Sequence, residues 1–296
     1  MIRLLAPAKL NLYLRVLGRR PDGYHELETL FERIDLADEL TFTPQERGIT
    51  VTCDDSTLAC GESNLVTKAA TLLRQTCGVS QGATIHLTKR IPVAAGLGGG
   101  SSDAATTLIG LNRLWGLPLP ISRLRELGAQ LGADVPVFFE QAPFVMGRGR
   151  GDACELVAPP WPTLWHVLVV PPARLSTKDV YEGFDRSTLT TSRPFSSIVL
   201  HALRNGSLRE LAEGFVNDLQ PEAIRRCPVI QDIQGFLQSY PCLGTMVSGS
   251  GPSVFGLCQD QSQAEAVSQR LHQVGDPSWR MAVVHTLSTD SDDDTR

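Results

Sequence analysis

The stretch of sequence with the clearest chemical meaning is rich in glycine and ends in two serines and an aspartate. Residues 92–103 read PVAAGLGGGSSD, follow a predicted strand and lead into a predicted helix. Glycines let a backbone adopt positive φ and approach a ligand closely. The N-terminus of the helix adds free N–H groups and the positive end of a dipole, and the serines add hydroxyl donors. The stretch predicts a phosphate site; a flexible turn with a serine cap is the simpler structural alternative.

Two well-known phosphate loops do not match this stretch. It lacks the Gly-Lys-Ser/Thr ending of a Walker A loop, and it lacks both the strict GxGxxG register and the βαβ context of a dinucleotide site. Asp103 is expected in the first turn of the helix, where a carboxylate is favourable to the dipole. A metal-binding or supporting role is the alternative for Asp103.

Three residues outside this loop carry groups suited to acid–base chemistry. Lys9 and Asn11 lie two residues apart in a predicted strand and so share one face. Asp134 lies between a helix end and an apolar stretch, where a partly desolvated carboxylate needs a partner. Near a cation such a carboxylate stays ionised and can act as a base. The alternatives are a solvated lysine and an aspartate that caps a turn.

Three further segments are open to both a functional and a structural interpretation. Residues 248–253, SGSGPS, form a loop longer than a tight hairpin needs, which indicates approach to a ligand or to the first glycine loop. Tyr24 and His25 could stack on a nucleobase and hydrogen-bond to it. The arginines of residues 147–151, GRGRG, could contact phosphate. For each segment the alternative is an ordinary surface or half-buried loop.

The elements that must position these residues mix strands and helices without strict alternation, which favours an α+β fold. Alternation of apolar and polar residues predicts strands over 4–17, 49–53 and 83–88. Helical spacing predicts helices from 64 to 75 with Ser63 as cap, from 101 or 102 to 115, and over 122–131. After a proline-rich boundary at 158–162, we expect strands over 165–170 and 281–287 and a strand, turn and strand over 245–257. Helices are expected there over 177–184, 194–204, 208–215, 230–238 and 263–273.

Composition excludes several classes of protein. The chain has 296 residues, of which 42% are hydrophobic, so a sizeable core can form. Its net charge of −5 argues against a nucleic-acid footprint. The first residues lack the apolar core of a signal peptide, and no apolar run reaches ~18 residues, so we expect no membrane span and a cytoplasmic location. Seven scattered cysteines without CxxC predict reduced thiols, and no obligate protein partner is evident.

Four motifs, taken in order, resemble the GHMP kinase superfamily. They are PAKLNLYLRVLGRRPDGYHELETLF at 7–31, IPVAAGLGGGSSDAA at 91–105, GADVPVFF at 132–139 and SGSGPSVFG at 248–256. The resemblance covers about residues 3–287. It implies a two-domain α+β GHMP kinase fold with the active site in the interdomain cleft. The domains would be an ATP-binding domain at 1–157 and a C-terminal domain at 158–287, followed by a disordered acidic tail at 288–296.

The resemblance also implies an activity and a set of site residues. The reaction would be ATP-dependent phosphorylation of the 2-hydroxyl of a small molecule, a cytidine diphosphate derivative of methylerythritol, in the non-mevalonate route to isoprenoid precursors. Lys9 would support Asp134, the general base. Substrate would be bound by Asn11, Tyr24, His25, Tyr181 and Gly249. ATP would be bound by Pro92, Val93, Ala94, Ala95, Gly96, Leu97, Gly98, Gly99, Gly100, Ser101, Ser102 and, near the adenosine, Asn64.

The implied metal and the competing functions complete these expectations. Mg²⁺ is expected to bridge the phosphates, with Ser102 and Asp103 as candidate ligands. The DGYH segment argues against a GHMP kinase for another alcohol, such as mevalonate or homoserine. Retention of both Lys9 and Asp134 argues against a non-catalytic nucleotide-binding module.

Overall fold

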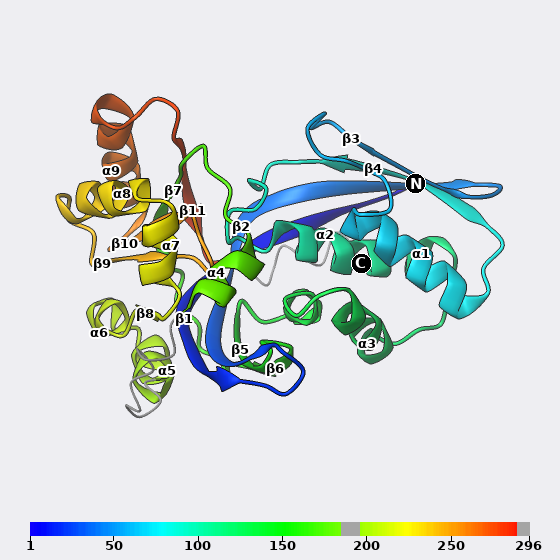
Figure 1. Ribbon diagram of the computed structural model, residues 1–296, viewed down its shortest axis with the longest axis horizontal. Coiled ribbons are helices and arrows are strands. Elements are labelled where there is room, and N and C mark those ends of the chain that lie inside the picture. The colour runs from blue at the N-terminus through cyan, green and yellow to red at the C-terminus, as the bar shows by residue number, and fades with distance from the viewer. Residues whose placement is uncertain (185–195, 289–296) are drawn as a thin grey trace.

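The computed structural model describes residues 1–184 and 196–288 (Figure 1). The part of the predicted tail at 289–296 and the start of the helix predicted at 194 lie outside these ranges. The strands are β1 (Ile2–Arg19), β2 (His25–Gln45), β3 (Ile49–Cys53), β4 (Gly82–Thr88), β5 (Phe144–Gly149), β6 (Ala153–Leu156), β7 (Trp165–Val170), β8 (Val216–Asn217), β9 (Gly244–Val247), β10 (Val254–Cys258) and β11 (Arg280–His285). The helices are α1 (Leu65–Cys77), α2 (Gly99–Leu114), α3 (Ile121–Leu131), η1 (Pro136–Phe139), α4 (Thr177–Gly183), α5 (Ser196–Asn205), α6 (Leu208–Glu213), α7 (Gln220–Arg226), α8 (Val229–Gln238) and α9 (Gln261–Val274).

The larger sheet is built around the long antiparallel pair of β1 and β2. Its order is β3-β4-β2-β1-β8, and β5 and β6 extend it from β2. Helices α1, α2 and α3 pack on it around a core that includes Phe42, Ile85 and Leu108 (Figure 1). The pairing of β1 with β2 is interrupted between Pro7 and Lys9 and again beyond Asn11, so both site residues of β1 lie between irregularities.

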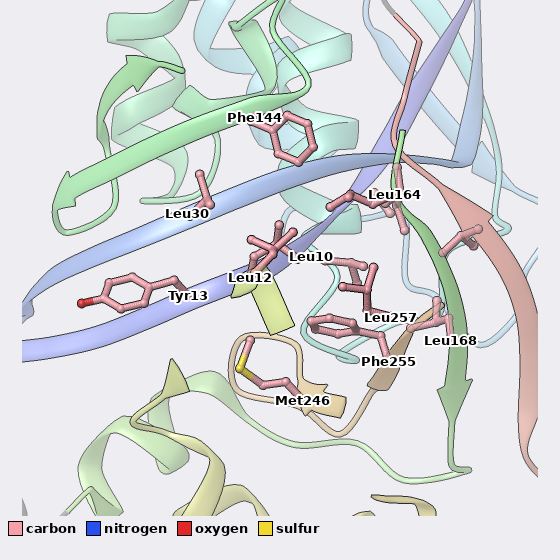
Figure 2. Packing of buried hydrophobic residues seen from close by; sticks show 14 of the residues in the cluster. Leu10, Leu12, Tyr13, Leu30, Phe144, Leu164, Leu168, Met246, Phe255 and Leu257 are labelled. Atoms are coloured by element: carbon pink, nitrogen blue, oxygen red, sulfur yellow. The ribbon is translucent and has the colours of Figure 1, made fainter. Parts of the chain in front are cut away.

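The smaller sheet has the order β11-β7-β10-β9 and packs against α7, α8 and α9. Its other face shares a core with the larger sheet. Figure 2 shows Leu10 and Leu12 of β1 packed with Phe255 and Leu257 of β10, and all four side chains are fully buried. Burial of apolar surface across this junction fixes β1, and with it Lys9 and Asn11, against the second sheet. The α+β architecture expected from the sequence is confirmed.

Strand β2 is the main element that the sequence analysis missed. From Leu27 to Ile34 every residue is buried, including Glu28, Thr29, Glu32 and Arg33. Because both faces of this segment are covered, apolar and polar residues do not alternate, and the signal for a half-buried strand is absent.

The helix predictions are confirmed with shifts at the ends. Asn64, not Ser63, caps α1 by accepting a hydrogen bond from the Val66 N–H at 2.9 Å. Among residues 1–184 and 196–288, no helix combines the length and apolar character needed to cross a bilayer. All seven cysteines are free thiols.

Candidate active site

A cavity of about 1120 Å³ brings together the residues that the sequence singled out. It is lined from β1 by Lys9 and Asn11, from the C-terminal half by Tyr181 and Gly249, and from the turn before η1 by Asp134. Tyr24, His25, Asn64 and residues 92–101 of the glycine loop also line it. Of the predicted site residues, Ser102 alone does not.

Lys9 is a buried cation at the centre of this cavity. Lys9 is 3% exposed, and its Nζ lies 3.7 Å from Asp134 Oδ2. The same Nζ donates to Asn11 Oδ1 at 2.6 Å and to the Gly96 carbonyl at 3.1 Å. Burial lowers the pKa of Lys9, and the charge of Asp134 opposes that shift. The solvated alternative for Lys9 is therefore wrong.

Asp134 reaches the cavity from the short turn between α3 and η1. Its side chain is 40% exposed, whereas the neighbouring Val135 and Phe138 are buried. The carboxylate thus has the cationic partner that the sequence analysis expected, and it is more accessible to a ligand than its apolar neighbours suggested. Asn11, beside the pair, is held by a hydrogen bond from its Nδ2 to Thr29 Oγ1 at 2.8 Å.

The two glycine loops pack against each other. Ser248 Oγ donates to the Gly96 carbonyl at 3.0 Å, and the Ser253 N–H donates to the Ala95 carbonyl at 3.3 Å. Gly96 has φ +79°, and a Cβ there would lie 2.1 Å from the Ser248 carbonyl oxygen. Only glycine allows this approach, so the second loop does contact the first.

Helix α2 begins at Gly99 with Gly98 as its N-cap, earlier than predicted. Ser101 faces the cavity in the first turn, and Ser102 is fully buried away from it. The N–H groups of this first turn have no intrahelical partner, because an α-helix leaves its first N–H groups unpaired. Free N–H groups at a helix N-terminus are suited to bind an anion, and the phosphate site stays a prediction.

Asp103 is not in the first turn, so the dipole interpretation of this residue is wrong. Its Oδ2 accepts from Lys89 Nζ at 2.9 Å, and Lys89 also pairs with the fully buried Asp38. Burial raises the pKa of Asp103 to about 7, Lys89 opposes the shift, and Asp38 adds to it. The Asp103 carboxyl group is therefore paired with Lys89. The described residues hold no cluster of three or more His, Cys, Asp or Glu that could bind a metal.

Aromatic rings also line the cavity. The rings of His25 and Tyr181 lie 5.1 Å apart, and the Arg150 guanidinium lies 5.1 Å from the ring centre of Tyr24. Arg150 is held there by Asp152 through its Nε at 2.9 Å. One arginine of the GRGRG segment therefore belongs to the site, and burial raises the pKa of Tyr181 above its ordinary value.

Three features of the site were missed by the sequence analysis or differ from what it predicted. Asn64 lines the cavity, but its amide is occupied by capping α1 and by donating to the Ala59 carbonyl at 2.9 Å. Lys89 also lines the cavity, and its place three residues before the glycine loop was a signal that could have found it. Asn217 supports the second glycine loop from outside the cavity and had no local signal.

Comparison with known proteins assigns the family. Residues 64–148 match the GHMP kinases N terminal domain, and residues 199–276 match the GHMP kinases C terminal domain. A 4-diphosphocytidyl-2-C-methyl-D-erythritol kinase of Pelotomaculum thermopropionicum is 42% identical over 91% of this chain and 93% of its own. The chain belongs to this family of GHMP kinases. A second member, from Syntrophus aciditrophicus, is 39% identical over 97% of this chain and 100% of its own.

Solved structures agree with that assignment. A crystal structure of 4-(cytidine 5'-diphospho)-2C-methyl-D-erythritol kinase has a TM-score of 0.81 at 33% identity, covering 97% of this chain and 100% of that one. A homoserine kinase from Cytophaga hutchinsonii shares the fold, with a TM-score of 0.77 at 22% identity over 97% of this chain and 94% of that one. The family is therefore a small-molecule kinase family that uses ATP.

Proposed function

We propose that this enzyme phosphorylates the 2-hydroxyl of 4-diphosphocytidyl-2-C-methyl-D-erythritol with ATP, giving the 2-phosphate and ADP, in the non-mevalonate route to isoprenoid precursors. The observation that carries the proposal is the pair of Lys9 Nζ and Asp134 Oδ2, 3.7 Å apart in a cavity that both glycine loops line. The kinship with relatives of that name supports the choice of substrate.

The side chains have distinct roles in this reaction. Asp134 accepts the proton of the substrate hydroxyl while the hydroxyl oxygen bonds to the γ-phosphorus, and the bond from that phosphorus to the ADP oxygen breaks with its electron pair leaving on ADP. Lys9, buried and cationic, stabilises the negative charge that develops between the two oxygens. Residues 92–101 and the first turn of α2 bind the ATP phosphates.

Mg²⁺ is part of the proposal, and bound with ATP it would neutralise phosphate charge. The site fits such an ion as a companion of the nucleotide and not as a resident metal, because Asp103 is paired with Lys89 and the buried Ser102 does not line the cavity. The half-exposed Asp134 is the carboxylate that remains accessible to ligands beside the phosphate loop.

The pyrimidine would lie among Tyr24, His25 and Tyr181, where flat rings can stack on a base. Asn11 and Gly249 would contact the methylerythritol end beside Lys9, and Asn64 would lie near the adenosine. We also retain a domain boundary at 157/158, supported by the separation of β1–β6 from β7 and β9–β11 into two sheets. The cytoplasmic location and the lack of an obligate protein partner stay predictions.

The test is a coupled ADP-release assay with ATP, Mg²⁺ and one candidate alcohol at a time. ADP release with the cytidyl substrate, and none with mevalonate or homoserine, is the expected result. Release with another of these alcohols would keep the kinase chemistry and overturn the pyrimidine pocket. If no alcohol supports release while ATP still binds, the chain is instead a nucleotide-binding module.

A further inference from the structure

Asn217, in the two-residue strand β8, makes a complete set of hydrogen bonds without lining the cavity. Its Nδ2 donates to the Val247 and Gly249 carbonyls, both at 2.8 Å, and its Oδ1 accepts from the Leu219 N–H at 2.9 Å. Carbonyl oxygens only accept hydrogen bonds, so the amide nitrogen must face them and the side chain has one orientation. The residue is 8% exposed, so water cannot replace these bonds.

The backbone that carries Asn217 is fastened to β1. Asn217 pairs with Leu14 in a parallel register, and the Asp218 N–H donates to the Leu14 carbonyl at 3.0 Å. The Asp218 carboxylate accepts from the Val16 N–H at 2.9 Å and from Arg15 Nη1 at 3.0 Å. Because β1 also carries the catalytic lysine, Asn217 holds the second glycine loop at a fixed distance from the strand on which the chemistry depends.

Gly249, which Asn217 binds, lies close to Lys9 and Asn11. It has φ +55°, and a Cβ at this position would lie 3.2 Å from both Lys9 Nζ and Asn11 Oδ1. A side chain at position 249 would therefore crowd the ammonium. A shift of the loop therefore changes both the position and the water exposure of Lys9.

We propose that Asn217 is a positioning residue for phosphoryl transfer, whose amide holds Gly249 against Lys9 and Asn11. The inference rests on the proposed function, and it adds a residue that touches neither substrate nor nucleotide. Misplacement of reacting groups by about 1 Å can slow a reaction by about 10²-fold. Loss of the two amide donors should therefore act on turnover more than on ATP binding.

The test compares Asn217→Asp with Asn112→Asp. The first is nearly isosteric and keeps the acceptor for Leu219, but it removes both donors. The second makes the same change at a half-buried amide in the last turn of α2, whose Nδ2 donates to the Leu119 carbonyl at 3.1 Å. We expect Asn217→Asp to lower kcat roughly 10- to 100-fold with the KM for ATP nearly unchanged. Asn112→Asp should lower Tm and leave kcat within about twofold, since its hydrogen bond lies at the end of α2 opposite the glycine loop.

A second readout does not depend on the substrate. In ¹³C-lysine-labelled protein, assigned with Lys9→Met, the titration midpoint of Lys9 should rise toward its ordinary value in Asn217→Ser, which adds no charge, because water reaches the ammonium. If the wild type does not turn over the cytidyl substrate, the proposed function fails, and this titration still decides the role of Asn217.

Three results overturn the inference. They are an unchanged kcat in Asn217→Asp, an unchanged Lys9 titration, and an equal loss of kcat in Asn112→Asp. If Asn217→Asp does not fold, Asn217→Ser is measured in its place, since its hydroxyl retains one donor. Asn217→Ser should show a smaller decrease in kcat than the decrease expected for Asn217→Asp. A wild-type kcat in Asn217→Ser would also overturn the inference.

Discussion

At the scale of single residues, the proposed chemistry depends on the contrast between Lys9 and Asp134. Lys9 is almost fully buried, whereas Asp134 is half-exposed and faces the cavity. A buried cation strengthens electrostatic stabilisation because its charge is weakly screened. An accessible carboxylate can meet a hydroxyl within hydrogen-bond distance. The division of roles therefore follows from burial, and neither residue type alone dictates it.

Replacement of Asp134 by asparagine keeps the shape of the side chain and removes its basicity. We expect kcat to fall roughly 10²- to 10⁴-fold, the range for loss of a general base, while the Kd for ATP stays the same. Steady-state kinetics and ATP titration calorimetry measure the two quantities. Asp276→Asn, at an exposed aspartate that bonds only to Ser278, is the control. Near-normal turnover of Asp134→Asn would remove Asp134 from the base role.

Replacement of Tyr24 by alanine tests the aromatic end of the cavity. We expect substrate binding to weaken by about 1–3 kcal/mol, the contribution of one ring stacked on a base, with ATP affinity unchanged. Tyr24→Phe retains the ring under Arg150 and should bind nearly as the wild type does. Equilibrium binding of the cytidyl substrate distinguishes the variants. Equal affinity in all three proteins would place the pyrimidine elsewhere.

At the scale of elements, the contact between the two glycine loops depends on one residue without a side chain. Gly96→Ala combines a positive φ with a Cβ placed 2.1 Å from the Ser248 carbonyl oxygen. Gly116→Ala is the matched control, because Gly116 has φ +62° and no atom lies within 4 Å of the position that its Cβ would take. The control should cost about 1–2 kcal/mol of unfolding free energy. Gly96→Ala should lower the free energy of unfolding by clearly more than the control does, and it should also lower kcat. Equal losses of unfolding free energy in the two variants, measured by urea denaturation, would contradict the tight contact.

Helix α2 and the segment before the glycine loop are joined by the buried Asp38–Lys89–Asp103 group. Burial raises the pKa of Asp103 to about 7, so the folded state binds this proton more tightly than the unfolded chain does. The contribution to stability is thus full below pH ~4 and is lost as the pH rises to about 7. Asp103→Asn should flatten this fall in urea midpoints between pH 4 and 8. Parallel pH profiles of wild type and variant would show that Asp103 does not titrate there.

At the scale of the whole molecule, a buried polar contact joins the two sheets. His166 of β7 and Glu32 of β2 are both fully buried, with His166 Nε2 and Glu32 Oε2 2.8 Å apart. Thr286 Oγ1, which follows β11, donates to the other oxygen of Glu32 at 2.7 Å. The contact lies beside the shared apolar core and adds a direction-specific link to it.

His166→Phe leaves the Glu32 carboxylate short of one partner in a dry environment. We expect a loss of about 1–3 kcal/mol in the free energy of unfolding, the cost of an unsatisfied buried polar group. His201→Phe, at an exposed position of α5, should change it by less than about 0.5 kcal/mol. Chemical denaturation measures both variants. If His166→Phe and the wild type have the same free energy of unfolding, the junction between the sheets depends on apolar packing alone.

The sequence by itself determined which residues are candidates for the chemistry and the local structure around most of them. The phosphate loop, the strand with Lys9 and Asn11, and most helices depend on glycine content, side-chain alternation or helical spacing within a few residues. These signals depend on residues that are close together in the sequence, so they can be recognised from the sequence alone. They failed for β2, whose burial on both faces removes alternation, and for Asp103, whose environment is set by distant residues.

Tertiary structure alone decided how these residues meet. Lys9 and Asp134 are far apart in the chain, and the apolar core that β1 and α2 share with the residues after Asp134 brings the two together. The contact of Gly249 with Lys9 and the support from Asn217 likewise join segments from the two ends of the chain. Local propensity acts over a few residues, whereas proximity depends on how apolar surfaces are buried together, which is a property of the whole fold.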